Sequence, residues 1–191
     1  MSDGPRLRTV VADTSALVSL AVPRADAGFD TDTTPDPLQY LLTSCDVSVP
    51  PTVVSELREV AGYRDIHATA ASNVLAADAH YTVTDPYQRP ETPDSRPTFG
   101  LDDGETDGIV LANALAVDGF LTDEFGGTNF ALVHAALRGP RIVPTPRLIC
   151  DYARGGHLTH EDARRLITGI SPHRSWENSP YVARLLAGLE E

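Results

Sequence analysis

Several carboxylates of this 191-residue chain stand where α/β proteins place reactive groups. Asp13 and Asp123 each directly follow a short apolar run that is typical of a buried strand. Because sites in open parallel sheets form beyond the carboxyl ends of the strands, both side chains are predicted to lie at one sheet edge. Either aspartate alone could instead be a helix N-cap.

Three further acids belong to predicted helices. Glu56 lies one turn into a helix, in PTVVSELREV, and by itself could be a surface glutamate. Glu105 and Asp107 lie at the start of an apolar helix, in LDDGETDGIVLANAL, where acids also interact with the helix dipole. Asp102 and Asp103 crowd the same segment, and we expect these two to face solvent. Like charges so close raise one another's pKa values unless a cation or solvent offsets them.

Such a set of carboxylate oxygens predicts that the offsetting cation is a divalent metal ion. Mg²⁺ and Mn²⁺ prefer a few carboxylates with water completing the shell, and two such ions promote phosphodiester cleavage. This chemistry needs no cysteine, no histidine and no glycine-rich phosphate loop, and the chain has no convincing version of these. The four predicted members of the site are Asp13, Glu56, Asp107 and Asp123.

The elements that must position these acids alternate along the chain. Short apolar segments between helical patterns predict the α/β class with a mostly parallel sheet. We expect strands at 7–12, 46–49, 80–83, 119–122 and 141–143. We expect helices at 15–22, 37–44, 66–79, 108–117, 129–137, 146–155, 159–170 and 179–189, and one capped by Thr52.

The remaining segments set the domain organisation. Segments 23–37 and 84–98 are rich in proline and aspartate and predict loops. One domain over 1–170, followed by a helical tail at 171–191 that packs on the body or on a partner, is the economical organisation.

The charge of the chain is strongly acidic and uneven. It has 27 acidic residues against 15 basic ones, and every basic residue is arginine, which fits a salt-loving organism. Residues 138–191 hold eight arginines against six acids, whereas residues 1–137 hold seven against 21. The basic third could be a footprint for a polyanion, or its arginines could simply be solvated. A net charge of −12 excludes reliance on long-range attraction to RNA.

Neither a membrane nor a secretory pathway is expected for this chain. No apolar run approaches the roughly 18 residues that a membrane span needs. The N-terminal MSDGPRLR leads into only a short apolar run, unlike a secretory signal, so we expect a cytoplasmic protein.

Four motifs, in order and at these spacings, resemble the PIN-domain nuclease family over about residues 8–150: VVADTSALVSL, VPPTVVSELREV, LDDGETDGIVLANAL and GFLTDEF. The resemblance implies a three-layer α/β/α sandwich with a central five-stranded, mostly parallel sheet. It also implies dependence on Mg²⁺ or Mn²⁺ and endonucleolytic cleavage of RNA. The family's metal ligands fall on Asp13, Asp107 and Asp123, and its helical glutamate, a ligand or proton acceptor, falls on Glu56.

The GETD and TDE sequences are similar to a prokaryotic PIN subgroup related to the toxins of toxin–antitoxin pairs. This likeness implies a small antitoxin protein and a homodimer as partners. PIN toxins are commonly shorter, so the two Pro/Asp-rich loops and the tail are additions. The auxiliary residues implied are Thr14, Ser15, Glu105, Glu124 and Asn129.

Residues of the basic third offer candidates for substrate contacts. Arg138, Arg141 and Arg147 are predicted to contact phosphates. Trp176 and Tyr181 are predicted to pack rather than to stack on bases.

Two other functions fit part of the pattern. A PIN-like domain that keeps its acids could be a catalytically inactive binding module. A phosphatase of the haloacid-dehalogenase type also begins from a strand-end aspartate. It would require a second aspartate where this chain has Ser15, and a lysine, which the chain lacks.

Overall fold

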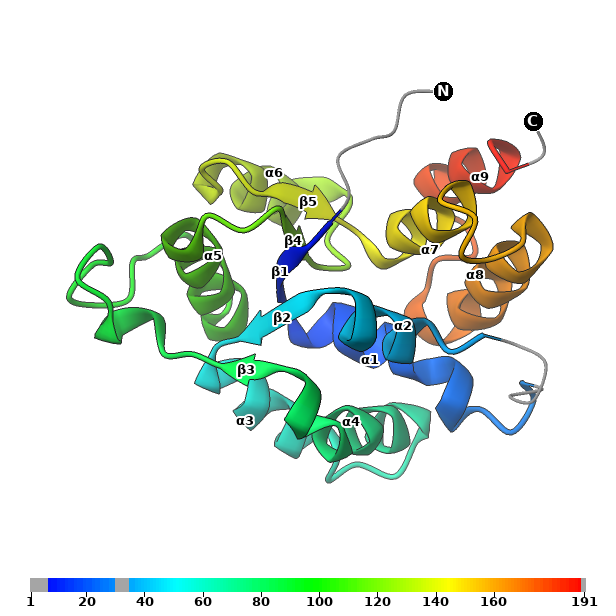
Figure 1. Ribbon diagram of the computed structural model, residues 1–191, viewed down its shortest axis with the longest axis horizontal. Helices are drawn as coiled ribbons and strands as arrows, with labels where there is room; N and C mark the ends of the chain where they lie inside the picture. Colours follow the sequence, from blue (N-terminus) through cyan, green and yellow to red (C-terminus); the bar gives the residue numbers. More distant parts are fainter. Residues whose placement is uncertain (1–6, 30–34, 190–191) are drawn as a thin grey trace.

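The predicted α/β class is confirmed: a five-stranded, entirely parallel sheet lies between two layers of helices (Figure 1). The computed structural model describes residues 7–29 and 35–189, so part of the predicted loop 23–37 lies outside the described residues. The sheet order is β3-β2-β1-β4-β5. The strands are β1 (Thr9–Ala12), β2 (Asp46–Val49), β3 (Thr82–Val83), β4 (Gly119–Leu121) and β5 (Arg141–Val143).

Helices connect these strands and cover both faces of the sheet. They are α1 (Thr14–Ala25), α2 (Pro37–Ser44), α3 (Pro51–Val60), α4 (Ile66–Ala76), α5 (Asp103–Leu115), α6 (Gly127–Ala136), α7 (Thr145–Arg154), α8 (His160–Arg174) and α9 (Pro180–Ala187). Over the described ranges, none of them combines the length and the apolar character needed to cross a membrane.

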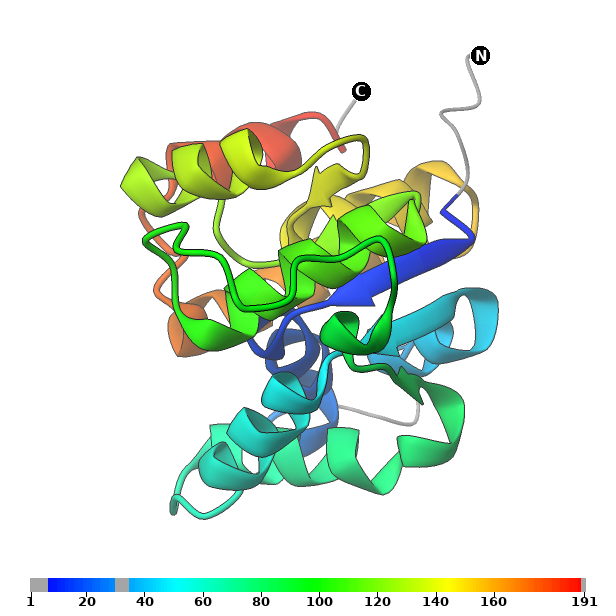
Figure 2. The same ribbon diagram turned by 90° about the vertical axis from the view of Figure 1, so that its left-hand side faces the viewer.

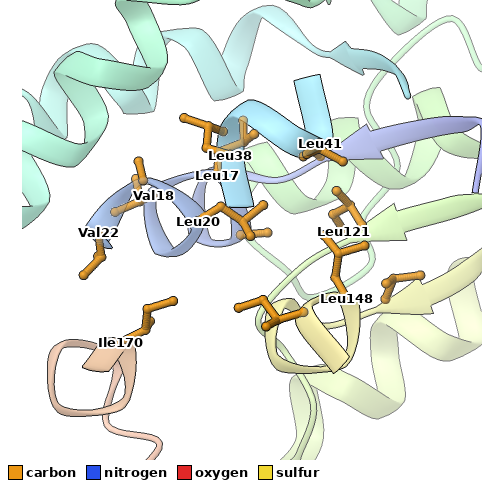
Figure 3. Packing of buried hydrophobic residues seen from close by; sticks show 14 of the residues in the cluster. Leu17, Val18, Leu20, Val22, Leu38, Leu41, Leu121, Leu148 and Ile170 are labelled. Carbon is orange, nitrogen blue, oxygen red and sulfur yellow. The ribbon is translucent and has the colours of Figure 1, made fainter. Parts of the chain in front are cut away.

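Alternation along the strands divides the core into two parts, because successive strand residues point to opposite faces. Val11 and Phe120 pack with α5 and α6, whereas Val10 and Leu121 join a larger core built with the other helices. Figure 2 shows α5 on one side of β1 and the α3–α4 pair on the other. Figure 3 shows side chains of α1, α2, β4, α7 and α8 meeting in the larger core.

All predicted helix starts but one lie within two residues of the observed ones. The helix predicted to be capped by Thr52 is instead preceded by Pro50 at its N-cap and begins at Pro51. Helix α5 begins at Asp103 rather than at residue 108, because the Asp102 carboxylate accepts a hydrogen bond from the Glu105 N–H at 2.8 Å and caps the helix. The crowded acids therefore belong to the first turns of α5.

The tail is continuous with the body. Helix α8 runs through the expected boundary at residue 170 and ends at Arg174, where Ser175 adopts a left-handed conformation with φ of 57°. Val182 and Leu185 of α9 are buried in the larger core, and Figure 1 shows α9 beside α7.

Candidate functional site

The strand order reverses between β1 and β4, which is where open α/β sheets bind ligands. Asp13 and Asp123 both lie at this edge, as predicted. Ser15 links them, because its hydroxyl donates to Asp13 Oδ2 at 2.7 Å and accepts from the Asp123 N–H at 3.2 Å. Asp13 precedes α1, but its side chain makes no capping hydrogen bond, which disfavours a purely capping role.

Asp13 is a buried carboxyl with 6% of its surface exposed. Burial raises its pKa to about 7, and repulsion from Asp102 and Glu56 adds to this, while the Ser15 hydrogen bond opposes it. The group is therefore balanced between its neutral and ionised forms near neutral pH.

Glu56 reaches the same edge from α3. Its carboxylate accepts hydrogen bonds from the Thr14 hydroxyl and from the backbone of Gly104. A Cβ atom on Gly104 would overlap the Glu56 carboxylate, so a larger residue at the start of α5 would force this carboxylate to move. Burial nevertheless raises the pKa of Glu56.

Glu105 completes a cluster with Asp13 and Glu56. Its side chain is 3% exposed, and its buried Oε1 has no hydrogen-bond partner. Burial raises the pKa of Glu105 to about 8, and repulsion from Asp13 and other neighbouring acids adds to this. Within the described part of the chain, no arginine forms an ion pair with any of these three acids, which we call the three-acid cluster.

Asp107 does not face this cluster. Arg96, from the loop that follows β3, donates to both Asp107 carboxylate oxygens at 2.7 and 2.8 Å, and the Tyr87 hydroxyl donates to Oδ1 at 2.6 Å. Although burial opposes it, these bonds lower the pKa of Asp107. Arg96 also pairs with Asp103 at 2.6 Å. The predicted metal ligand Asp107 thus already holds a cationic side chain.

Asp123 and Glu56 lie on different sides of Asp13. Asp123 follows β4, on one side of β1, whereas Glu56 belongs to α3, which follows β2 on the other side. Its carboxylate accepts from the Ser19 hydroxyl, from the Thr145 N–H at 3.3 Å and from Arg174 Nη2 at 3.4 Å. Burial raises its pKa, with Arg174 acting in the opposite direction. Asp123 therefore joins α1, α7 and the end of α8.

The other predicted residues are divided among different places. Thr14 and Ser15 orient Glu56 and Asp13, and Glu124 is close enough to contribute to the raised pKa of Glu105. Asn129 is exposed on α6.

The arginines predicted to bind phosphate are not gathered at the cluster. Arg138 and Arg141 are exposed near the amino end of β5, whereas the acids lie at the carboxyl end. Arg147 follows the carboxyl end of β5, but its Nε pairs with Asp151 at 2.9 Å.

Sequence reasoning missed Arg96, Tyr87, Ser19 and Arg174 as partners of the predicted acids. The basic C-terminal third was a signal for Arg174. No local sequence pattern indicates that Arg96 contacts Asp107, because this contact depends on the path of the loop that carries Arg96.

The chemistry of the three-acid cluster fits a hard divalent cation, since all its donors are oxygens and one buried oxygen has no partner. The ligand atoms are of the type that such a cation prefers, but their positions do not form a complete coordination shell. Over residues 7–29 and 35–189, no group of three or more acidic, histidine or cysteine side chains is arranged so that it could hold a metal ion as it stands.

The chain matches no protein-family model, no curated protein and no solved structure. Its function must therefore be inferred from the chemistry of the site and from the motifs that build it.

Proposed function

We propose that this chain is an endoribonuclease of the PIN type that depends on Mg²⁺ or Mn²⁺, with Asp13, Glu56 and Glu105 holding the ion. The observation that carries the proposal is the buried Glu105 Oε1 without a partner, next to another buried acid of raised pKa. Buried carboxylates are costly unless a positive charge offsets them. A cation is the simplest compensation.

When bound, such an ion stabilises negative charge on a phosphodiester and makes water nucleophilic at neutral pH. The residues of the chain orient the ligands. Ser15 holds Asp13 Oδ2, and Thr14 and the backbone of Gly104 hold Glu56. Glu56, which is half-buried, is the candidate to accept a proton from the attacking water.

In this proposal, Asp107 and Asp123 support the site from either side. Asp107 anchors the loop that carries Arg96, and Asp123 fixes the start of α7 and the end of α8. The choice of RNA, a small antitoxin partner and a homodimer follow from the family resemblance.

A catalytically inactive binding module is disfavoured, because burying Asp13 and Glu105 beside the half-buried Glu56 costs folding free energy that no binding role of these acids explains. A phosphatase of the haloacid-dehalogenase type is disfavoured because Ser15, which bonds Asp13 and Asp123, occupies the position where that chemistry requires a second aspartate.

The test compares Asp13→Asn and Glu105→Gln with the wild type in Mn²⁺-dependent cleavage of a labelled RNA. Each substitution removes one cation ligand and is expected to lower the cleavage rate at least about a hundredfold. Calorimetric titration should show weaker Mn²⁺ binding as well. Glu161→Gln, at an exposed position on α8, is the matched control and should cleave normally. Cleavage that survives Asp13→Asn in a folded protein would exclude the proposed centre.

A further inference from the structure

A pocket of about 580 Å³ opens next to the acidic edge. Ser15, Asp123 and Glu124 line it on the sheet side, and residues from the end of α8 and from α9 line the other side. None of the three proposed cation ligands lines this pocket, so the proposed cation site does not account for it.

Aromatic rings form one wall of this pocket. Phe125 and Tyr181 are stacked, with centroids 5.0 Å apart and an angle of 27° between the rings. Trp176 packs edge-on behind Phe125 at 6.0 Å and is 4% exposed. The predicted packing role holds for Trp176 and for Tyr181, which packs against the larger core, but Tyr181 is only half-buried and also lines the pocket.

Two arginines bring positive charge to the same pocket. Arg174 contacts the Asp123 carboxylate and the Ser15 carbonyl only at 3.4 Å, and its buried Nε has no hydrogen-bond partner. Arg184 is exposed on α9 and forms no ion pair within the described part of the chain. The exposed part of Arg174, 21% of its side chain, and the exposed Arg184 can therefore contact an anion in the pocket.

The wall continues into a second pocket. This pocket of about 610 Å³ shares Phe125, Tyr181 and Arg184 with the first and extends along β5 and α6. Phe130 and His134 of α6 also line it. The shared residues form a ridge between the two pockets, so one extended ligand could contact both.

We infer that the two pockets form the path of a single-stranded RNA segment next to the acidic edge, with Arg174 and Arg184 binding phosphates and the Phe125–Tyr181 pair stacking on bases. This inference rests on the proposed function, whose substrate it narrows to unpaired RNA. Arginines beside an aromatic platform are how proteins bind single strands without sequence preference.

The binding test uses a fluorescein-labelled single-stranded RNA oligonucleotide of mixed sequence, at low salt and with EDTA so that no cleavage occurs. Fluorescence anisotropy reports the dissociation constant. Arg184→Glu should weaken binding about tenfold and reduce the salt dependence by about 0.7 in logarithmic slope for each lost phosphate contact. The matched control is Arg64→Glu, the same charge change at an exposed site between α3 and α4, far from α9 in both views (Figures 1 and 2). It should bind within about twofold of the wild type.

The stacking role is tested at Tyr181. Tyr181→Leu keeps the apolar packing but removes the ring, and should weaken binding about tenfold, whereas Tyr181→Phe should retain it. Circular dichroism and thermal unfolding establish that every variant is folded.

Equal binding by Arg184→Glu and Arg64→Glu would overturn the inference, as would wild-type binding by Tyr181→Leu, which would indicate a charged patch only. Failure of the wild type to bind the oligonucleotide at low salt would also overturn it and would favour a protein as the occupant. Because binding is measured without divalent metal, the two proposals fail separately. RNA that binds as expected but is not cut with Mn²⁺ contradicts only the nuclease. RNA that is cut although all variants bind alike contradicts only the path.

Discussion

At the scale of single residues, Asp13 and Glu105 are the groups whose charge state is least ordinary. Burial and repulsion by neighbouring acids raise their pKa values to about 7 and about 8. Exposed carboxyls ionise near pH 4, so these two retain protons that the unfolded chain would release.

This difference predicts how stability depends on pH in the absence of divalent metal. Between about pH 4 and pH 8 the folded protein binds more protons than the unfolded chain, so stability falls as pH rises through this window. Chemical denaturation in EDTA should show a loss of about 2 to 4 kcal/mol between about pH 6 and about pH 8.5. Asp13→Asn should lose less, because its amide does not ionise, and Glu161→Gln should behave as the wild type.

Adding Mn²⁺ at the higher pH should restore stability to the wild type and not to Asp13→Asn. Identical pH profiles for the wild type and Asp13→Asn would contradict the raised pKa of this carboxyl.

The sequence predicted Asp13, Glu56, Asp107 and Asp123 as one site. The structure brings Asp13 and Glu56 together with Glu105, whereas Asp107 is held by Arg96. Glu105 and Asp107 are separated by about 200° around a helix, so only one can face Asp13. Which one does depends on where α5 begins and how it is rotated against the sheet. Packing of α5 on the face that includes Val11 and Phe120 sets this rotation, and the pattern of charges does not reveal it.

At the scale of elements, Arg96 and Tyr87 anchor the loop between β3 and α5 to Asp107. Arg96 forms paired hydrogen bonds with Asp107 and a further ion pair with Asp103. Asp107 is 4% exposed at its side chain, so losing Arg96 would leave a buried carboxylate without its charged partner.

Arg96→Gln is therefore expected to destabilise the protein by about 2 to 4 kcal/mol in urea denaturation. Arg89→Gln, in the same loop, breaks the more exposed pair with Glu91 and should cost at most about 1 kcal/mol. Equal losses from the two substitutions would contradict an anchoring role for the Arg96–Asp107 pair.

At the scale of the whole molecule, the net charge of −12 opposes folding through repulsion among surface acids. Dissolved salt screens this repulsion. Raising KCl from about 0.1 M to about 2 M should increase the melting temperature by several degrees, whereas sucrose at equal osmolality should give a smaller rise. A melting temperature that does not respond to KCl would show that the acids are already balanced locally.

The order of strands and helices could be predicted because apolar periodicity is local information. Runs such as those at Val10 and Phe120 indicate strands wherever they occur. The connection of the tail to the site was not predictable, because it depends on Arg174 reaching Asp123 across 51 positions of the chain.

That contact also limits how the length of α8 can vary. Each residue inserted into or deleted from an α-helix rotates everything after it by about 100° and shifts it by about 1.5 Å. Arg174 is the last residue of α8, and Ser175 turns the chain back towards Trp176 and α9. A change of one or two residues within α8 would therefore turn Arg174 away from Asp123 and misdirect everything beyond it. Because a helix fixes the direction of each side chain, the number of residues between Thr159 and Arg174 must be kept for Arg174 to reach Asp123.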